Sequence, residues 1–366
     1  MHIHAAVLRD SSAPLRIETL ELRAPGRGEV LVEIAATGVC HTDMLPRRAG
    51  FLAQPPIVLG HEGAGVVTAV GDDVTGVQVG DHVLISYASC GECRTCLAGE
   101  PFNCFRFFAL NMTGRDADSD GPMTDEAGHP VASSWFGQSS FATHTVVSAA
   151  NVVRVAKDLP LQLLAPMGCG FQTGAGAVLR ALRASAGSTI AVIGVGAVGL
   201  AAVMAARAAD CAEIIAVDRN EKRLAVAEKL GATMVFDSSA VAFDKAIRST
   251  VRGGVDAIID TTGSAAVIEA AIGAVRPGGR VGMVGTVDRD LAIPAGALGP
   301  SKTLLGIIEG GAVPGEFIPE LVTLWRDGNF PIDDLITTYP LSEINRAEAD
   351  LRAGTVVKPV ILPNVI

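Results

Sequence analysis

The segment 188–218 constrains the fold more than any other part of the chain, because three closely spaced glycines separate two apolar runs. The first run is mostly β-branched, as expected of a strand buried on both faces of a sheet. The first glycine allows a tight turn, the second lets the backbone approach a pyrophosphate, and the third lets a helix pack on the strand. A strand at 189–193 is followed by the G-x-G-x-x-G turn of Gly194, Gly196 and Gly199. A helix at 198–209, a strand at 213–217 and the acid Asp218 come next. This order predicts a dinucleotide-binding unit.

The alternative for this segment is a membrane span, because residues 188–206 carry no charge. The glycine pattern and the early charges of Arg207 and Asp210 argue against a span. Asp218 can accept hydrogen bonds from a ribose diol and would repel a 2′-phosphate, so NAD is favoured over NADP. Arg219 weakens this preference, since it could meet a phosphate, and Arg223 could hydrogen-bond the ribose instead.

Helix and strand patterns keep alternating after Asp218 as far as about residue 284, which predicts a doubly wound parallel sheet. Residues 1 to about 36 instead show short strands separated by turn residues. With 366 residues the chain can hold two domains. The expected fold class is therefore α/β, with a β-rich domain beside a doubly wound one.

The net charge of −10 disfavours nucleic acid and anionic membranes as partners, and a small-molecule substrate is expected instead. The N-terminus lacks a basic segment followed by an apolar core. No secretory signal is therefore expected, and the expected location is the cytoplasm. In that setting, the seven cysteines are expected to be thiols or metal ligands rather than disulfides.

Four of the cysteines form a loop with the spacing C-x2-C-x2-C-x7-C: Cys90, Cys93, Cys96 and Cys104. Four thiolates so close together can surround one tetrahedral ion, and zinc is the natural choice. An iron–sulfur cluster is the rival, but ferredoxin motifs close with x3-Cys-Pro, whereas Phe105 follows Cys104 here. A closed four-sulfur site is expected to brace the structure and to do no chemistry.

Cys40, His61 and Cys169 form a second candidate set, each close to a glycine at the end of an apolar element. Two thiolates and one imidazole would leave the fourth position of a zinc ion open, as in catalytic zinc sites of the alcohol dehydrogenase type. Taken singly, a buried cysteine is more often a small apolar side chain, and a lone histidine more often a satisfied core residue. Their occurrence together with the cysteine loop and the dinucleotide unit favours the metal site.

In the order and spacing of these motifs the chain resembles the zinc-dependent medium-chain alcohol dehydrogenases over nearly all its length. The motifs are Gly60-His61-Glu62-Gly63-Ala64-Gly65, the cysteine loop, Cys169 and Gly194-Val195-Gly196-Ala197-Val198-Gly199. Residues 86–90 and 136–142 are similar to the aryl-alcohol (benzyl alcohol) branch. The resemblance implies a GroES-like domain, 1–165 and 300–366, and a Rossmann domain, 166–299. It also implies two zinc ions per chain and a cleft holding alcohol and nicotinamide.

The resemblance also assigns roles to single residues. Cys40, His61 and Cys169 would bind catalytic zinc, with Glu62 near the ion as an occasional ligand. Asp43 would fix the tautomer of His61, and Thr42 would hold the alcohol proton. Cofactor contacts are implied for a further set: Thr173 and Val198 against the nicotinamide, and His41 and Lys358 near the pyrophosphate.

The expected reaction is reversible oxidation of a primary alcohol to an aldehyde, because zinc lowers the pKa of an alcohol and so favours hydride loss to NAD. Many relatives carry a proton-relay histidine three residues after the Thr42 position, where this chain has Leu45. The proton then leaves either through ribose and water, which we favour, or through another base such as His41.

The expected substrates are benzyl-type or allylic (terpenol) alcohols, whose aldehydes are stabilised by conjugation. Two alternatives stay open: a dehydrogenase of thiol adducts such as S-hydroxymethyl thiols, with the same fold, and a non-catalytic NAD-binding protein. A homodimer or homotetramer is expected, since residues 303–308 could pair across a two-fold axis at a sheet edge.

Overall fold

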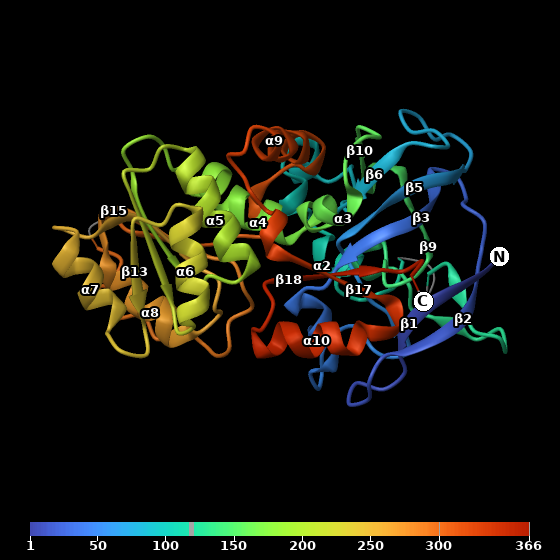
Figure 1. Ribbon diagram of the computed structural model, residues 1–366, viewed down its shortest axis with the longest axis horizontal. Coiled ribbons are helices and arrows are strands. Elements are labelled where there is room, and N and C mark those ends of the chain that lie inside the picture. Colours follow the sequence, from blue (N-terminus) through green and yellow to red (C-terminus); the bar gives the residue numbers. More distant parts are fainter. Residues whose placement is uncertain (117–120, 300, 366) are drawn as a thin grey trace. The chain divides into compact units, whose positions relative to one another are not determined.

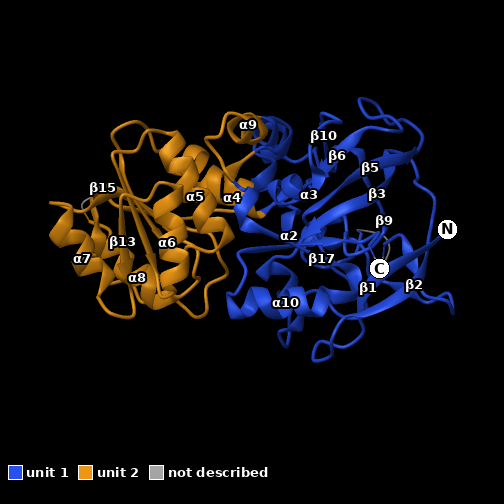
Figure 2. Ribbon diagram, in the orientation of Figure 1, with its two compact units in different colours: residues 1–169, 313–319, 332–366 blue, residues 170–312, 320–331 orange. Residues whose placement is uncertain are grey.

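The computed structural model describes residues 1–116, 121–299 and 301–365. The chain divides into two compact units, coloured separately in Figure 2. Unit 1 comprises Met1–Cys169, Val313–Pro319 and Ile332–Ile366, and unit 2 comprises Gly170–Ala312 and Glu320–Pro331. The predicted α/β class, with a β-rich part and a part built on a parallel sheet, is confirmed.

Unit 1 is rich in β-structure and contains two sheets (Figure 1). One sheet has the strand order β4-β1-β2-β7-β8, and the other has the order β10-β6-β5-β3-β18-β17, with β9 also paired to β3. The strands are β1 (His2–Leu8), β2 (Arg16–Leu22), β3 (Glu29–Gly38), β4 (Ile57–Val58), β5 (Gly63–Val70), β6 (His82–Ile85), β7 (Met123–Thr124), β8 (Pro130–Val131), β9 (His144–Ser148), β10 (Val152–Val155), β17 (Ile336–Pro340) and β18 (Lys358–Leu362).

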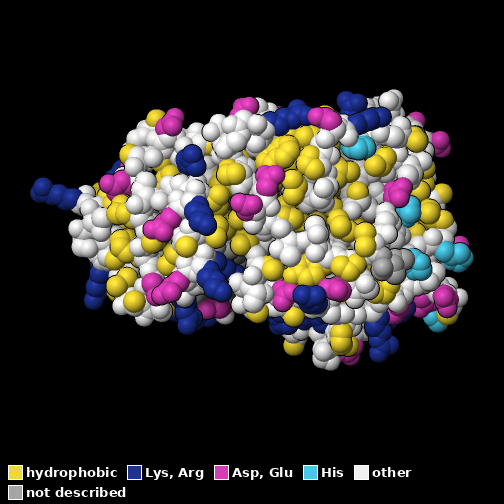
Figure 3. Space-filling view, viewed as in Figure 1, with side chains coloured by type: hydrophobic (Ala, Val, Ile, Leu, Met, Phe, Trp, Pro, Cys, Tyr) yellow, Lys and Arg dark blue, Asp and Glu magenta, His cyan; other side chains and the backbone are white. Residues whose placement is uncertain are grey.

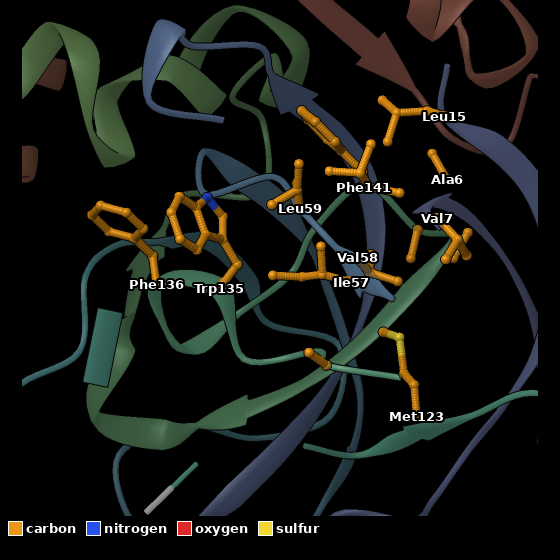
Figure 4. Packing of buried hydrophobic residues seen from close by; sticks show 14 of the residues in the cluster. Ala6, Val7, Leu15, Ile57, Val58, Leu59, Met123, Trp135, Phe136 and Phe141 are labelled. Atoms are coloured by element: carbon orange, nitrogen blue, oxygen red, sulfur yellow. The ribbon is translucent and has the colours of Figure 1, made fainter. Parts of the chain in front are cut away.

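Short helical segments connect these strands: η1 (His41–Arg47), α1 (Arg94–Leu97), η2 (Pro101–Asn103), α2 (Phe107–Asn111), η3 (Trp135–Gly137), η4 (Ala149–Asn151), α3 (Leu161–Leu164), η5 (Ala165–Gly168), η8 (Asp333–Leu335), η9 (Leu341–Glu343) and α10 (Ile344–Ala353). The main core of the unit joins residues from its first and last segments, among them Leu20, Phe141 and Ile361. Figure 4 shows part of this core, with Trp135 and Phe136 next to each other. Burial of such large side chains is the main stabilising term of the unit.

Unit 2 is built on a six-stranded, entirely parallel sheet with the order β13-β12-β11-β14-β15-β16. The strand order reverses between β11 and β14, which is where doubly wound folds bind dinucleotides. The elements are α4 (Gly170–Gly176), η6 (Ala177–Ala181), β11 (Thr189–Ile193), α5 (Ala197–Ala208), β12 (Glu213–Asp218), α6 (Glu221–Leu230), β13 (Met234–Asp237), α7 (Phe243–Thr250), β14 (Val255–Asp260), α8 (Ala265–Ala274), β15 (Val275–Met283), β16 (Thr303–Gly306) and η7 (Glu309–Gly311); α9 (Pro314–Arg326) runs through both units.

Along the chain, unit 1 changes to unit 2 after Cys169, and unit 2 changes back to unit 1 after Ala312. The boundaries expected from the sequence lay after residue 165 and before residue 300. The later boundary has a clear cause, because β16 pairs with β15 of the parallel sheet. The turn η7 that follows β16 packs on α4, and Gly310 lies against Gly176 there.

Among the described residues, no helix is both long enough and apolar enough to cross a membrane. On the face drawn in Figure 3, basic and acidic side chains are interspersed, and no large basic patch is visible.

Candidate functional site

The predicted catalytic set converges within unit 1 from three parts of the chain. Cys40 lies between β3 and η1, His61 and Glu62 lie between β4 and β5, and Cys169 follows η5. One ligand atom from each of these four residues lies within 4.8 Å of the others. Gly60 helps to bring His61 there, since its φ is +89° and a Cβ would overlap Phe141. The sequence thus folds a compact donor set of two thiols, an imidazole and a carboxylate.

Asp43 is a buried residue of η1 that hydrogen-bonds to two members of this set. Its Oδ1 accepts hydrogen bonds from His61 Nδ1 at 2.7 Å and from Gly60 N at 3.0 Å, and its Oδ2 accepts one from Cys40 N at 3.0 Å. Because a carboxylate only accepts, Nδ1 of His61 carries a proton, and in the neutral imidazole Nε2 presents a lone pair. Asp43 therefore orients two of the three predicted zinc ligands.

The chemistry of the donors fits a zinc ion. His61 is fully buried, and its Nε2 has no hydrogen-bond partner among the described residues. A buried nitrogen without a partner is costly unless a ligand takes its lone pair. Contacts with Cys169 and His61, together with the charge of Lys358, hold the pKa of the Cys40 thiol well below its usual range, against the opposing effect of burial. Thiolate and neutral imidazole are the donors that zinc prefers.

Lys358 lies beside Glu62, although the resemblance implied a contact with pyrophosphate. Its Nζ lies 2.9 Å from both carboxylate oxygens of Glu62 and donates to Val39 O at 3.3 Å, and both side chains are buried. Burial lowers the pKa of Lys358, but the carboxylate outweighs this effect and the net pKa is raised. Burial raises the pKa of Glu62, and the lysine opposes it. A pyrophosphate contact of Lys358 stays a prediction.

The four cysteines of the loop also lie together, around the short helix α1. Ligand atoms of Cys90, Cys93, Cys96 and Cys104 lie within 4.8 Å of one another. The sulfur of Cys96 is 3.5 Å from that of Cys93 and 3.9 Å from that of Cys90. Sulfurs bound to one tetrahedral zinc lie about 3.8 Å apart. The spacing therefore suits the structural ion predicted from the sequence.

Electrostatics within the loop also favour a cation. The Thr95 hydroxyl and backbone N–H groups lower the pKa of Cys93 to about 5, whereas burial and contact with Cys93 raise the pKa of Cys96 to about 12. A thiolate at Cys96 would be repelled by the negative charge of the Cys93 thiolate, and a bound divalent cation would offset this repulsion.

The glycine turn of unit 2 forms the expected cradle. A Cβ at Gly199 would overlap the carbonyl of Gly194, so only glycine lets α5 pack against β11 here. A Cβ at Gly196 would meet nothing within 4 Å among the described residues, so that position leaves space for a ligand. Oδ2 of Asp218 accepts from Val195 N at 2.8 Å, and Oδ1 accepts from Arg219 N and Asn220 N. The acid is thus fixed beside the turn, as a ribose acceptor must be.

The remaining predicted residues have more varied surroundings. Thr173 is buried on α4, and its Oγ1 lies 3.5 Å from Oε2 of Glu309. Arg219 is exposed, and its charge adds only a small part to the hydrogen bonds from Ser239 that lower the pKa of Asp237. Nε of Arg223 is buried without a partner among the described residues. The other three are more open: Val198 and Thr42 are partly exposed, and His41 is exposed.

Three residues at or near these sites were missed from the sequence. Trp135 Nε1 donates to Oδ1 of Asp43 at 3.0 Å, and the ring of Phe136 stacks on His61 with centroids 4.5 Å apart. Glu309 is buried in unit 2 and accepts from Gln172 Nε2 at 3.1 Å. One signal was available for Trp135, because a tryptophan in an apolar run needs a partner for its N–H. No sequence signal pointed to that partner, which lies 92 residues away.

Comparison with known proteins matches both units. A family model described as an alcohol dehydrogenase GroES-like domain matches residues 26–157, and one described as a zinc-binding dehydrogenase matches residues 197–325. A geraniol dehydrogenase of Castellaniella defragrans is 44% identical over 362 residues, covering 98% of this chain and 97% of that protein.

Two solved structures are also similar. A zinc-binding-domain alcohol dehydrogenase protein from Burkholderia ambifaria is 45% identical with a TM-score of 0.96, and 99% of each chain is covered. The benzyl alcohol dehydrogenase of Acinetobacter calcoaceticus is 40% identical with a TM-score of 0.93, again with 99% of each chain covered.

Proposed function

Because the chain belongs to the zinc-dependent medium-chain alcohol dehydrogenases, we propose that it oxidises an aryl or allylic primary alcohol reversibly to the aldehyde, with NAD as acceptor. As a member of this family it is an oxidoreductase. The observation that carries the proposal is the convergence of Cys40, His61 and Cys169, with the unpartnered Nε2 of His61 among them.

In this proposal Cys40, His61 and Cys169 hold the ion, and Asp43 keeps His61 in the tautomer that can bind it. Zinc, when bound, supplies a Lewis acid that lowers the pKa of the alcohol. The hydroxyl of Thr42 holds the proton that the alcohol releases. Leu45 is buried and apolar and cannot carry that proton further.

The cofactor half of the proposal rests on the glycine turn and Asp218. The open space at Gly196 suits a pyrophosphate, and the N-terminus of α5 favours its negative charge. The carboxylate of Asp218 would accept from the ribose diol of NAD and would repel the extra phosphate of NADP. Arg223, with its partner-free Nε, could bind the same ribose.

The substrate class is supported by aromatic rings near the metal ligands. Phe136 stacks on His61, Phe107 contacts Phe136 edge to face, and Tyr87 lies 5.7 Å from Phe107 between centroids. Such rings favour an apolar, conjugated alcohol over ethanol. Two of the similar proteins, a geraniol dehydrogenase and a benzyl alcohol dehydrogenase, are named for alcohols of this class, at 44% and 40% identity.

The test is a steady-state comparison of benzyl alcohol, geraniol, ethanol and S-hydroxymethylglutathione, each with NAD and with NADP. We expect kcat/KM for the first two to exceed that for ethanol by about 10- to 100-fold, since burying a ring or a prenyl chain is worth about 1.5–3 kcal/mol. NAD should be the better acceptor. A clear preference for the hydroxymethyl thiol would instead establish the thiol-adduct alternative.

The metal centre is tested with Cys40→Ala. This variant should lose turnover and fall from two zinc ions per chain to one, while NADH still binds as judged from its fluorescence. Cys211→Ala is the matched control, because Cys211 belongs to neither cysteine group. Normal turnover in Cys40→Ala, or a single zinc ion in the unmodified chain, would refute the assignment.

A further inference from the structure

We propose that Trp135 is a positioning residue for the metal centre, which holds His61 in place through the carboxylate of Asp43. The inference rests on the proposed zinc site and adds a residue that lies outside the ligand set. Its basis is the contact between the indole N–H and the same oxygen, Oδ1 of Asp43, that receives the proton of His61 Nδ1.

Four N–H groups donate to the carboxylate of Asp43. Oδ1 receives those of Gly60, His61 and Trp135, and Oδ2 receives that of Cys40. Three of the four donors thus share Oδ1 and fix the position of that oxygen. Trp135 is the only one of the four that is neither a zinc ligand nor next to one in the sequence. Its N–H therefore orients the carboxylate independently of the ligands.

The indole cannot easily leave this position. Trp135 has no exposed surface, and its ring packs edge-on against Phe51 and Phe136. Figure 4 shows it inside the main core of unit 1, beside Phe136. Its backbone N–H donates to Ser139 Oγ, and that hydroxyl donates to Val58 O just before the segment that carries His61. A residue so immobilised can fix its hydrogen-bond partner.

The turn 135–139, here called the Trp135 turn, contacts His61 directly in two further ways. Phe136 stacks on the imidazole ring with an interplanar angle of 26°. Gln138 Nε2 donates to the carbonyl of His61 at 3.0 Å, and its Oε1 accepts from Gly63 N. Phe136 and Gln138 thus hold the ring face and the backbone of His61 directly, and Trp135 of the same turn holds the ring edge through Asp43.

The backbone of the Trp135 turn shows that this arrangement is imposed by its surroundings. Phe136 has a φ of 52° and Ser139 a φ of 49°, in a region that side chains with a Cβ seldom adopt. Such strain persists where the surroundings over-determine it, often at functional sites. The strained backbone places the indole on Asp43 and the phenyl ring on His61 together.

The first experiment compares Trp135→Phe with Trp325→Phe, which removes the other tryptophan of the chain and lies outside both cysteine groups. Zinc affinity is measured by competition with a chelator, and the four-cysteine site in the same molecule serves as an internal standard. Loss of a residue that orients a ligand typically costs 10- to 100-fold in metal affinity. We expect a loss of that size at the Cys40–His61–Cys169 site only, and none in Trp325→Phe.

Cobalt substitution separates positioning from a general packing effect. The visible absorption bands of Co²⁺ depend on the geometry of its ligands, so they should shift in Trp135→Phe and remain unchanged in Trp325→Phe. Equal zinc affinity and equal cobalt spectra in Trp135→Phe and the unmodified protein would overturn the inference. A single zinc ion in the unmodified protein would instead overturn the proposed metal centre, so the two failures are distinct.

Trp325→Phe also gives a measurement that needs no change at Trp135. In that variant Trp135 is the sole indole, and its N–H contacts the carboxylate that binds a zinc ligand. Its fluorescence should change when zinc is added to the metal-depleted protein, at the stoichiometry of the catalytic site. If the fluorescence does not change as this site fills with zinc, Trp135 is not coupled to the metal ligands. This result would count even if Trp135→Phe fails to fold.

Discussion

At the scale of single residues, the buried pair of Glu62 and Lys358 combines a stability role with a place beside the metal ligands. Both charges are removed from water, and each is the main partner of the other. Breaking a buried pair is costly because it leaves one charge uncompensated, whereas removing both charges costs much less. Lys358 is therefore expected to be important for the stability of unit 1 even without a cofactor contact.

Lys358→Met should therefore lower the free energy of unfolding by about 3–5 kcal/mol, since the Glu62 carboxylate would stay buried without its cation. Denaturant unfolding of the metal-depleted protein measures this change. The double variant Glu62→Gln with Lys358→Met should recover most of the loss. If the single variant is as stable as the unmodified protein, the two charges are not coupled as described.

Both donor sets predicted from the sequence lie together in the structure, while their roles as metal ligands stay predictions. The cysteine loop could be identified because its four thiols lie within fifteen positions, and the second donor set because its residues carry metal-binding chemistry. Trp135 and Glu309 could not be found in this way. Their partners lie 92 and 137 residues away, and neither residue type is diagnostic of a site.

At the scale of elements, Asp256 joins the two central strands of the parallel sheet. Its Oδ2 accepts from the N–H and hydroxyl of Thr189, which begins β11, while Asp256 itself lies in β14. The Arg276 guanidinium donates to Oδ1 at 2.5 Å. Burial raises the pKa of Asp256, but these hydrogen bonds and the arginine outweigh it, so the net pKa is lowered.

Asp256→Asn should consequently destabilise unit 2 at neutral pH, by about 1–2 kcal/mol given the partial exposure of the site. The carboxylate contributes stability above its unfolded pKa, and this contribution is lost as the pH falls through the lower folded pKa. Unfolding free energies measured from pH 7 to pH 2 should therefore converge for the two proteins at the acidic end. Parallel curves would mean that the charge of Asp256 has no role.

Element prediction was reliable for the parallel sheet and weak for the turns of unit 1. Runs of β-branched apolar residues predict buried strands, and glycines predict the turn after β11. In the Trp135 turn, Phe136 and Ser139 have a left-handed backbone conformation, which their residue types do not predict. Its conformation is set by contacts with Asp43, Val58 and His61, which no local pattern reveals.

At the scale of the whole molecule, β16 is the edge strand of the six-stranded sheet. Leu304 packs toward the core of unit 2, while Leu305 is half-buried on the strand. An open strand edge offers unpaired backbone groups, and pairing with a second copy is one way to satisfy them. This supports the expected homodimer or homotetramer, which stays a prediction.

Light scattering should give a mass that is a multiple of the 37.6 kDa chain. Leu305→Lys should shift this mass toward that of the single chain, because a charge on an edge strand opposes pairing. Val241→Lys makes the same charge change at an exposed apolar position outside the strands and should keep the native mass. An unmodified protein that is already monomeric would exclude this role for β16.

The two-part architecture could be predicted because each part has its own motif, but the boundaries could not. Whether a connecting segment belongs to one unit or the other depends on what it packs against, as β16 and η7 show. Hydropathy along the chain does not contain that information.

Unit 1 is discontinuous, and this has a consequence for the order of events on the ribosome. Lys358 reaches Glu62 from 296 residues away, and β18 pairs with β3, so β18 must emerge before this sheet of unit 1 can be completed. Most of unit 2 is one uninterrupted run, which can fold while its neighbour is still incomplete. Six cysteines belong to unit 1 and are translated before β18, so we expect nascent chains to be more open to thiol oxidation at this stage than after folding.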